Sequence, residues 1–229
     1  MTVIQNRLFA FLDRVKIASN GRDNIKLIAV SKTKPSKMIQ ELFEAGQVHF
    51  GENRVQEARD KAPVLPDTID WHMIGPLQNN KVKYCPSIFS TIHTIHRSDT
   101  ASLLNQQCAA VYKRMDILVQ MNLSGEETKS GVQTLDQLHA LTDELMQFDH
   151  LRLIGMMTMG DPHVGDFENQ KIFANLREIT LKESERLGLK NQMVELSMGM
   201  TSDFEIALKE GATMIRVGSA IFGERNQTT

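Results

Sequence analysis

The sequence has few cysteines and no long apolar run, which argues against a disulfide-rich secreted protein and against a membrane protein. It holds two cysteines, Cys85 and Cys108, and their separation fits neither a redox pair nor a metal-binding pair. No apolar run approaches the length that crosses a bilayer, and the N-terminus lacks the apolar core and small-residue cleavage site of a secretory signal. We therefore expect a cytoplasmic protein in a reducing compartment, with no membrane partner.

The sequence also lacks a large excess of positive or negative charge. The 26 lysines and arginines face 28 aspartates and glutamates, which leaves a net charge of −2. A protein that neutralises the phosphates of a nucleic acid needs a basic surplus, so we expect no nucleic-acid partner. Four histidines (His49, His72, His93 and His96) fall on different predicted elements without HxH or HExxH spacing. We therefore expect no metal site.

Short apolar runs alternate with amphipathic stretches along most of the chain. Strands are predicted at 26–32, 48–52, 70–75, 88–95, 115–124, 151–159, 193–200 and 213–223. Helices are predicted at 36–46, 53–62, 78–85, 98–114, 134–148, 167–188 and 202–211. Strands that are apolar on both faces favour a parallel sheet covered by helices. We expect an α/β protein with a closed (β/α)8 TIM barrel over residues 1–229, one domain with an additional N-terminal helix. A doubly wound open sheet is the alternative.

The residues that follow each predicted strand are the candidates for a functional site, because barrels of this kind carry their active sites at the carboxyl ends of the strands. Lys32 stands at the end of the run Leu27 to Val30, in "LIAVSKTKP". A lysine there is either a solvated surface amine or a nucleophile for carbonyl chemistry. The neighbouring cation Lys34 and a desolvating barrel mouth would help Lys32 to lose its proton.

Small and hydroxyl residues lie in or directly after the carboxyl-terminal parts of the last two predicted strands. They are Ser197, Gly199 and Thr201 in "SMGMTSD", and Gly218 and Ser219 in "RVGSAIFG". Glycines let a phosphate approach backbone N–H groups, and this fold often binds phosphate after its seventh and eighth strands. The alternative is that these are ordinary turn glycines. Lys32 with a phosphate site allows an aldolase that forms a Schiff base with a ketose phosphate, or pyridoxal 5'-phosphate (PLP) held as an internal aldimine.

Arg216 lies inside an apolar strand, in "MIRVG". A buried guanidinium must be paired, so we expect it to meet either a ligand or a carboxylate in the barrel mouth. A structural ion pair explains the position equally well.

Six segments together resemble the pyridoxal phosphate homeostasis proteins, which are relatives of the alanine racemase N-terminal domain. They are "AVSKTKP", "FGENRVQEA", "WHMIGPLQNNK", "KSG", "SMGMTSDFEIAL" and "IRVGSAIFG". The match runs in order from about Leu27 to Gly223. The resemblance implies a barrel of the alanine racemase type that binds PLP and takes part in vitamin B6 and amino-acid homeostasis. It also implies a monomer whose partners are PLP and possible recipient apo-enzymes.

The resemblance assigns roles to particular residues. Lys32 would form the Schiff base with PLP, with Lys34 as a second amine near the entrance. Asn53 and Met200 would lie beside the cofactor, and Arg216 would face its pyridine nitrogen. The phosphate would be bound by Ser197, Gly199, Thr201, Gly218 and Ser219.

An arginine at the pyridine nitrogen has a chemical consequence. Arginine cannot accept a proton from the ring, so the pyridine stays neutral and is a weak electron sink. Racemases of this type have a second domain that supplies a tyrosine base, whereas Tyr84 and Tyr112 fall on predicted helices in this chain. We therefore expect a non-catalytic carrier, with a weakly active PLP-dependent racemase or decarboxylase as the alternative.

The chain departs from the family pattern at few positions. Arg54 stands where the family usually has tyrosine after "FGEN", which puts any role of that tyrosine in doubt. Thr201 replaces a common serine and keeps the hydroxyl. Lys129, in "TKSG", matches a lysine of the family and is a candidate for cofactor transfer or a secondary site.

Overall fold

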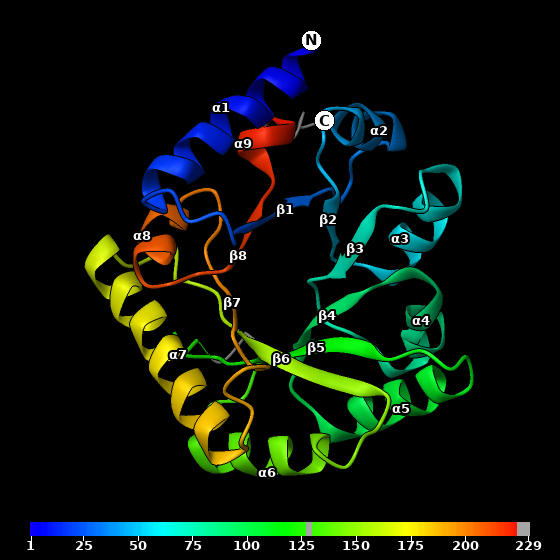
Figure 1. The fold of residues 1–229 in the computed structure, drawn as a ribbon, viewed down its shortest axis with the longest axis vertical. Coiled ribbons are helices and arrows are strands. Elements are labelled where there is room, and N and C mark those ends of the chain that lie inside the picture. Colours follow the sequence, from blue (N-terminus) through cyan, green and yellow to red (C-terminus); the bar gives the residue numbers. More distant parts are fainter. Residues whose placement is uncertain (127–129, 224–229) are drawn as a thin grey trace.

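Eight parallel strands close into a barrel in the computed structural model, which describes residues 1–126 and 130–223. Each strand pairs with the next along the chain, and β8 closes the barrel on β1 (Figure 1). The strands are β1 Lys26–Val30, β2 His49–Glu52, β3 Asp70–Met73, β4 Thr91–Ile95, β5 Met115–Gln120, β6 Leu151–Met157, β7 Glu195–Ser197 and β8 Met214–Val217. The predicted (β/α)8 barrel is confirmed, and the open sheet is wrong.

Helices surround the barrel on its outer face (Figure 1). They are α1 Val3–Ala18, α2 Ser36–Glu44, α3 Val55–Lys61, α4 Cys85–Ile88, α5 Ser98–Ala109, α6 Leu135–Leu145, α7 Asp166–Arg186, α8 Phe204–Lys209 and α9 Ser219–Phe222. Two 3-10 helices, η1 Ala62–Val64 and η2 Asn79–Tyr84, complete the set. Among the residues described, none of these helices combines the length and apolar character needed to span a membrane.

One predicted strand and two predicted helices differ from the observed elements. The predicted strand 213–223 is β8 followed by the short helix α9, because the chain turns at Gly218. The predicted helix 78–85 is η2 followed by α4, which has Pro86 in its first turn. The predicted helix 98–114 ends at Ala109.

The additional N-terminal helix α1 is part of the outer helical layer. Thr2 caps it through a capping box with Gln5. Ile4, Leu8, Phe11 and Val15 are buried, and their spacing of three to four residues places them on one face. This face packs against α2, α8 and α9, and the ring centroids of Phe11 and Phe204 are 4.6 Å apart. The helix therefore covers the closure between β8 and β1 (Figure 1).

The barrel has two apolar regions. A large one fills the space between the strands and the helices. A small one is formed by residues from strands on opposite sides, which meet in the barrel interior: Ile28, Leu118, Ile154, Met157 and Met214. The interior also holds buried polar side chains, among them His72, His93 and Arg216, unlike the branched apolar layers that commonly fill such barrels.

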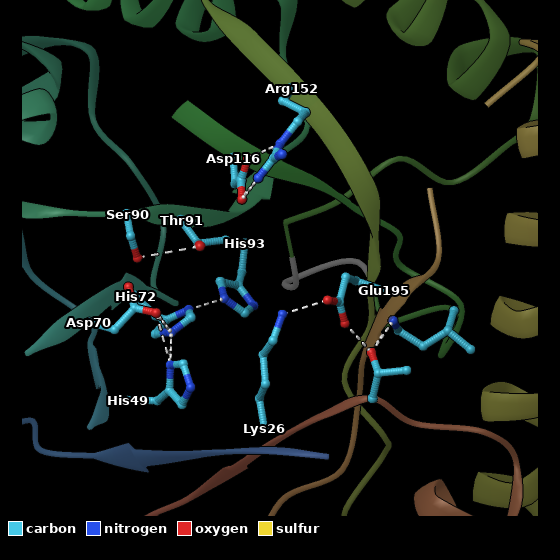
Figure 2. Close-up of polar contacts among 12 residues, drawn as sticks. Lys26, His49, Asp70, His72, Ser90, Thr91, His93, Asp116, Arg152 and Glu195 are labelled. Carbon is cyan, nitrogen blue, oxygen red and sulfur yellow. Dashed lines mark hydrogen bonds and ion pairs between the residues drawn. The ribbon is translucent and has the colours of Figure 1, made fainter. Parts of the chain in front are cut away.

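Charged pairs occupy the end of the barrel where the strands begin (Figure 2). Lys26 on β1 pairs with Glu195 on β7 at 2.5 Å, and Arg152 on β6 holds Asp116 on β5 through two hydrogen bonds of 2.5 and 2.6 Å. In this fold the amino-terminal end serves stability, whereas the opposite end carries the site.

Gly155 on β6 is needed for the close approach of β6 to β7. A Cβ at this position would lie 1.8 Å from the carbonyl oxygen of Glu195, its register partner on β7. We expect Gly155→Ala to lower the free energy of unfolding by about 2–4 kcal/mol, because two backbones would have to separate. Urea denaturation measures this. The control Gly165→Ala, whose Cβ would meet nothing within 4 Å, changes only a helix cap and should cost less than about 1 kcal/mol. Equal losses in the two variants would contradict the explanation.

Candidate functional site

A cavity of about 320 Å³ lies at the carboxyl ends of β1, β7 and β8. Its size falls at the lower end of the range for small-molecule sites. Six of the nine residues predicted for cofactor binding line it: Lys32, Met200, Thr201, Arg216, Gly218 and Ser219. The remaining wall comes from Val30, Thr33, Lys34, Ser202 and Gly223. The cavity therefore combines a lysine, a guanidinium, hydroxyls and glycine backbone.

The loop after β1 brings two lysines to this cavity. Thr33 lies between them in the left-handed region, with φ 63°, and its N–H donates to the carboxylate of Glu57 on α3. The Lys34 ammonium donates to the carbonyl of Gly223 at 3.2 Å. A left-handed threonine is strained and persists only where neighbours hold it. The loop is thus fixed, with Lys32 and Lys34 both on the cavity wall.

A buried ionic group supports the lysine loop from behind. One oxygen of the fully buried Glu52 accepts from the Ser31 hydroxyl at 2.6 Å and from the Lys61 ammonium at 2.8 Å. The Lys61 ammonium also donates to the carbonyl of Ser31 and to Glu57, at 2.8 and 2.9 Å. Burial raises the pKa of Glu52, against the opposing effect of Lys61. These contacts join the ends of β1 and β2 to α3.

Arg216 reaches the cavity from β8 and is 5% exposed. Its guanidinium donates to the Ser197 hydroxyl at 2.6 Å and to the Thr158 carbonyl at 2.9 Å. Burial lowers the pKa of Arg216 to about 10, although Asp203 raises it, so the group is protonated at neutral pH. The expected direct partner was a ligand or a carboxylate. Within the described chain the direct partners are instead a hydroxyl and a carbonyl, and Asp203 acts at longer range.

The other three predicted site residues do not line the cavity. Ser197 is fully buried beneath Arg216. Gly199 has φ 93°, and a Cβ there would lie 2.6 Å from the Cβ of Ala207, so this glycine serves the packing of α8. Asn53 lines a different hollow of about 630 Å³, together with Arg54. Lys129 lies outside the described residues.

A chain of histidines continues from Ser197 through the barrel interior, and Figure 2 shows its members His93, His72 and His49. The Ser197 hydroxyl is 2.8 Å from His93 Nδ1, His93 Nε2 is 3.0 Å from His72 Nδ1, and His72 Nε2 is 3.1 Å from His49 Nδ1. Burial lowers the pKa of His72 to about 3 and that of His93 well below its usual value, so both rings are neutral. His96 stands apart and contacts the Thr94 carbonyl.

Sequence reasoning treated these histidines as unrelated because they lie on separate strands. His49 lies on β2, His72 on β3 and His93 on β4, and these three strands are neighbours in the barrel. A usable signal was present: His49, His72 and His93 are each embedded in an apolar strand. A buried polar side chain needs a partner, and the partners available in a barrel are polar residues on adjacent strands.

A larger cavity, of about 540 Å³, lies elsewhere, between α6 and α7. Its lining includes Leu138, Ile179 and Arg186. It contains none of the predicted site residues, so its greater volume does not make it the better candidate.

Comparison with known proteins identifies the family. The alanine racemase N-terminal domain family matches residues 8–226. A pyridoxal phosphate homeostasis protein of Haemophilus influenzae is 38% identical over 234 residues, which cover 99% of this chain and 98% of that protein. A protein of the same name from Schizosaccharomyces pombe is also 38% identical, over 98% of this chain and 94% of its own length. The chain belongs to the pyridoxal phosphate homeostasis protein family.

Solved structures agree with this membership. PipY of Synechococcus elongatus PCC7942 is 33% identical, and the match covers 96% of this chain and 100% of PipY. The TM-score is 0.89 for the structure without PLP and 0.86 for the structure with PLP bound. An alanine racemase of Clostridium difficile has a TM-score of 0.75 at 17% identity and shares the fold over 59% of its length. The predicted resemblance is confirmed.

Two serines near the cavity of this homeostasis protein should differ in their effect on stability. Ser197→Ala removes one acceptor of the buried Arg216 guanidinium and the partner of His93 Nδ1, so it should cost about 1–3 kcal/mol. Ser219 is exposed, and its hydroxyl makes a long 3.4 Å contact with Thr201, so Ser219→Ala should cost less than about 0.5 kcal/mol. Chemical denaturation of both variants measures the difference. A stable Ser197→Ala variant would show that this hydroxyl does not hold the arginine.

Proposed function

We propose that this protein holds PLP covalently on Lys32 and takes part in PLP and amino-acid homeostasis without catalytic turnover. Residues 1–229 would act as one cofactor-binding domain. The observation that carries the proposal is the convergence of Lys32, Arg216, Thr201 and the Gly218–Ser219 backbone on one cavity of about 320 Å³. Membership in a family named for PLP homeostasis, and the PLP-bound structure of PipY, support it.

The residues of the cavity fit the chemical groups of PLP. Bound PLP supplies an aldehyde that forms a covalent bond with an amine, and Lys32 is the amine assigned to it. Thr201 and Ser219 provide hydroxyl donors for the phosphate, and Gly218 leaves room for close approach. A Cβ at Gly218 would project toward Val30, 3.5 Å away on the cavity wall.

Ser197, Gly199 and Asn53 take indirect roles in this proposal. Ser197 orients Arg216 through its hydroxyl, and Gly199 lets the loop after β7 pack on α8. Asn53 lies at the neighbouring hollow and is given no direct contact with the cofactor.

Two features argue for binding without turnover. Arg216 is a protonated donor that cannot take a proton from a pyridine nitrogen, so the ring keeps little capacity to accept electrons. Both tyrosines of the chain lie away from the cavity: Tyr84 ends η2, and Tyr112 is 95% exposed. Lys34 is a second amine on the cavity wall, but its ammonium is bonded to Gly223.

Lys32→Ala tests the assignment of the amine. The purified wild-type protein should be yellow, and borohydride should bleach it while fixing the cofactor to Lys32, as peptide mass spectrometry would detect. Lys32→Ala should lose this absorbance. The matched control Lys34→Ala removes an amine from the same wall and should keep the covalent link. A colourless wild-type protein that is trapped only with a ketose phosphate would favour an aldolase. An unchanged link in Lys32→Ala would refute the proposal.

A panel of amino acids distinguishes a carrier from an enzyme. We expect the PLP-loaded protein to leave each amino acid unchanged in configuration and in carboxylate content, as chiral chromatography and carbon dioxide release would measure. The same protein should restore activity to an apo PLP-dependent enzyme. Accumulation of the opposite enantiomer or of an amine would instead identify a racemase or decarboxylase with weak activity.

A further inference from the structure

Three side chains meet at the end of the barrel opposite the proposed cofactor cavity (Figure 2). His49 begins β2, Asp70 begins β3, and His72 follows two residues later on β3. His49 Nδ1 lies 3.0 Å from Asp70 Oδ2 and 3.1 Å from His72 Nε2, and the last two atoms are 3.8 Å apart. The His72 side chain is 2% exposed, whereas those of His49 and Asp70 are 25% and 36% exposed. The group is therefore open to solvent on one side.

The spacing of these atoms matches that of ligands around a small metal ion. A circle through three atoms with these separations has a radius of about 2.0 Å, which is the ordinary length of a zinc–nitrogen or zinc–oxygen bond. An ion in or just above this plane would contact all three atoms without moving them. Water could take a fourth position from the exposed side.

Neither tautomer of His49 gives this group a simple set of hydrogen bonds. His49 Nδ1 carries either a lone pair or one proton. With a lone pair, it faces the carboxylate oxygen of Asp70 as acceptor against acceptor at 3.0 Å. With a proton, that proton must serve both Asp70 and His72, which it faces at similar distances. A divalent cation would instead satisfy all three acceptors together.

The surroundings hold the ligands in the orientation that a metal requires. Histidine ligands usually donate their other ring N–H to a neighbouring acceptor, which sets the tautomer. His72 Nδ1 has such a partner in His93 Nε2, at 3.0 Å. The nearby ammonium of Lys26 would oppose a cation, but it is paired with Glu195 at 2.5 Å.

We propose that His49, Asp70 and His72 form a binding site for a divalent transition-metal ion of the zinc class. Two imidazoles and one carboxylate suit Zn²⁺ or Co²⁺ better than Mg²⁺ or Ca²⁺, which prefer all-oxygen ligand sets. The site lies on the opposite end of the barrel from Lys32 and is independent of the proposed cofactor function. It reverses the expectation of no metal site, which rested on the separation of the histidines in the sequence.

Metal titration tests the site directly. The tag-free protein, freed of metal with a chelator and of unbound PLP by dialysis, is titrated with Zn²⁺ or Co²⁺ in a calorimeter. We expect one ion per chain with micromolar or tighter affinity. His49→Gln and Asp70→Asn should each weaken binding by at least about 100-fold, more than the 10–100-fold typical of residues outside the ligand shell. Bound Co²⁺ should show the visible absorption of a four-coordinate site, without a thiolate charge-transfer band.

Two controls separate loss of the site from loss of the fold. His163→Gln removes an exposed histidine from the loop after β6 and should leave affinity unchanged. Zn²⁺ should raise the melting temperature of the wild type and of His163→Gln, but not that of His49→Gln, whose metal-free melting temperature shows that it is folded. Absence of binding in the wild type would overturn the proposal. So would full affinity in His49→Gln, or a thiolate band that placed the ion on Cys85 or Cys108.

Discussion

The hydrogen bond from the Arg216 guanidinium to the Ser197 hydroxyl connects the cavity with the barrel interior. A buried guanidinium keeps its charge and must be held by acceptors. The Ser197 hydroxyl and the Thr158 carbonyl fill this role, with Asp203 as the nearby negative charge. Because these positions are taken, Arg216 is presented to the cavity as a fixed donor. A ligand beside Arg216 would therefore meet a guanidinium whose orientation is held by its hydrogen bond to Ser197, beneath the cavity.

The same hydroxyl is the upper end of a polar column inside the barrel. Burying imidazoles costs little stability when each ring nitrogen has a partner, and a column of this kind fixes the orientation of every ring in it. Arg216 can only donate to Ser197, whereas the Ser197 hydroxyl can donate to His93 Nδ1 or accept from it. Its lower end, at His49 and Asp70, is partly exposed. The barrel interior thus links a solvent-facing group to the cavity through four hydrogen-bonded contacts in succession.

The sequence was sufficient to predict the barrel, since eight apolar runs alternate with helical stretches. It also identified the loops that form the cavity, because strand ends are recognisable from the pattern. The sequence could not show which of the side chains in these loops point into the cavity. Ser197 ends β7 and Thr201 follows it in the next loop, yet Ser197 lies beneath the cavity and Thr201 lines its wall. Gly199 was predicted to contact a phosphate, but its positive φ and the lack of room for a Cβ beside Ala207 also require a glycine there. Such distinctions depend on neighbours distant in sequence.

The two walls of the cavity are held by separate supports, which suits the proposed role of holding a ligand. The lysine loop is tied through Thr33 and Glu57 to the buried pair of Lys61 and Glu52. A buried pair of this kind contributes positional specificity more than stability. The opposite wall is fixed by Arg216 and its acceptors. A ligand that bridges both walls meets groups that are already bonded elsewhere, and catalysis needs a group free to exchange a proton within reach of the reacting atom. The hydrogen-bonded state of Lys34 and Arg216 leaves both better suited to orienting a ligand than to moving its protons.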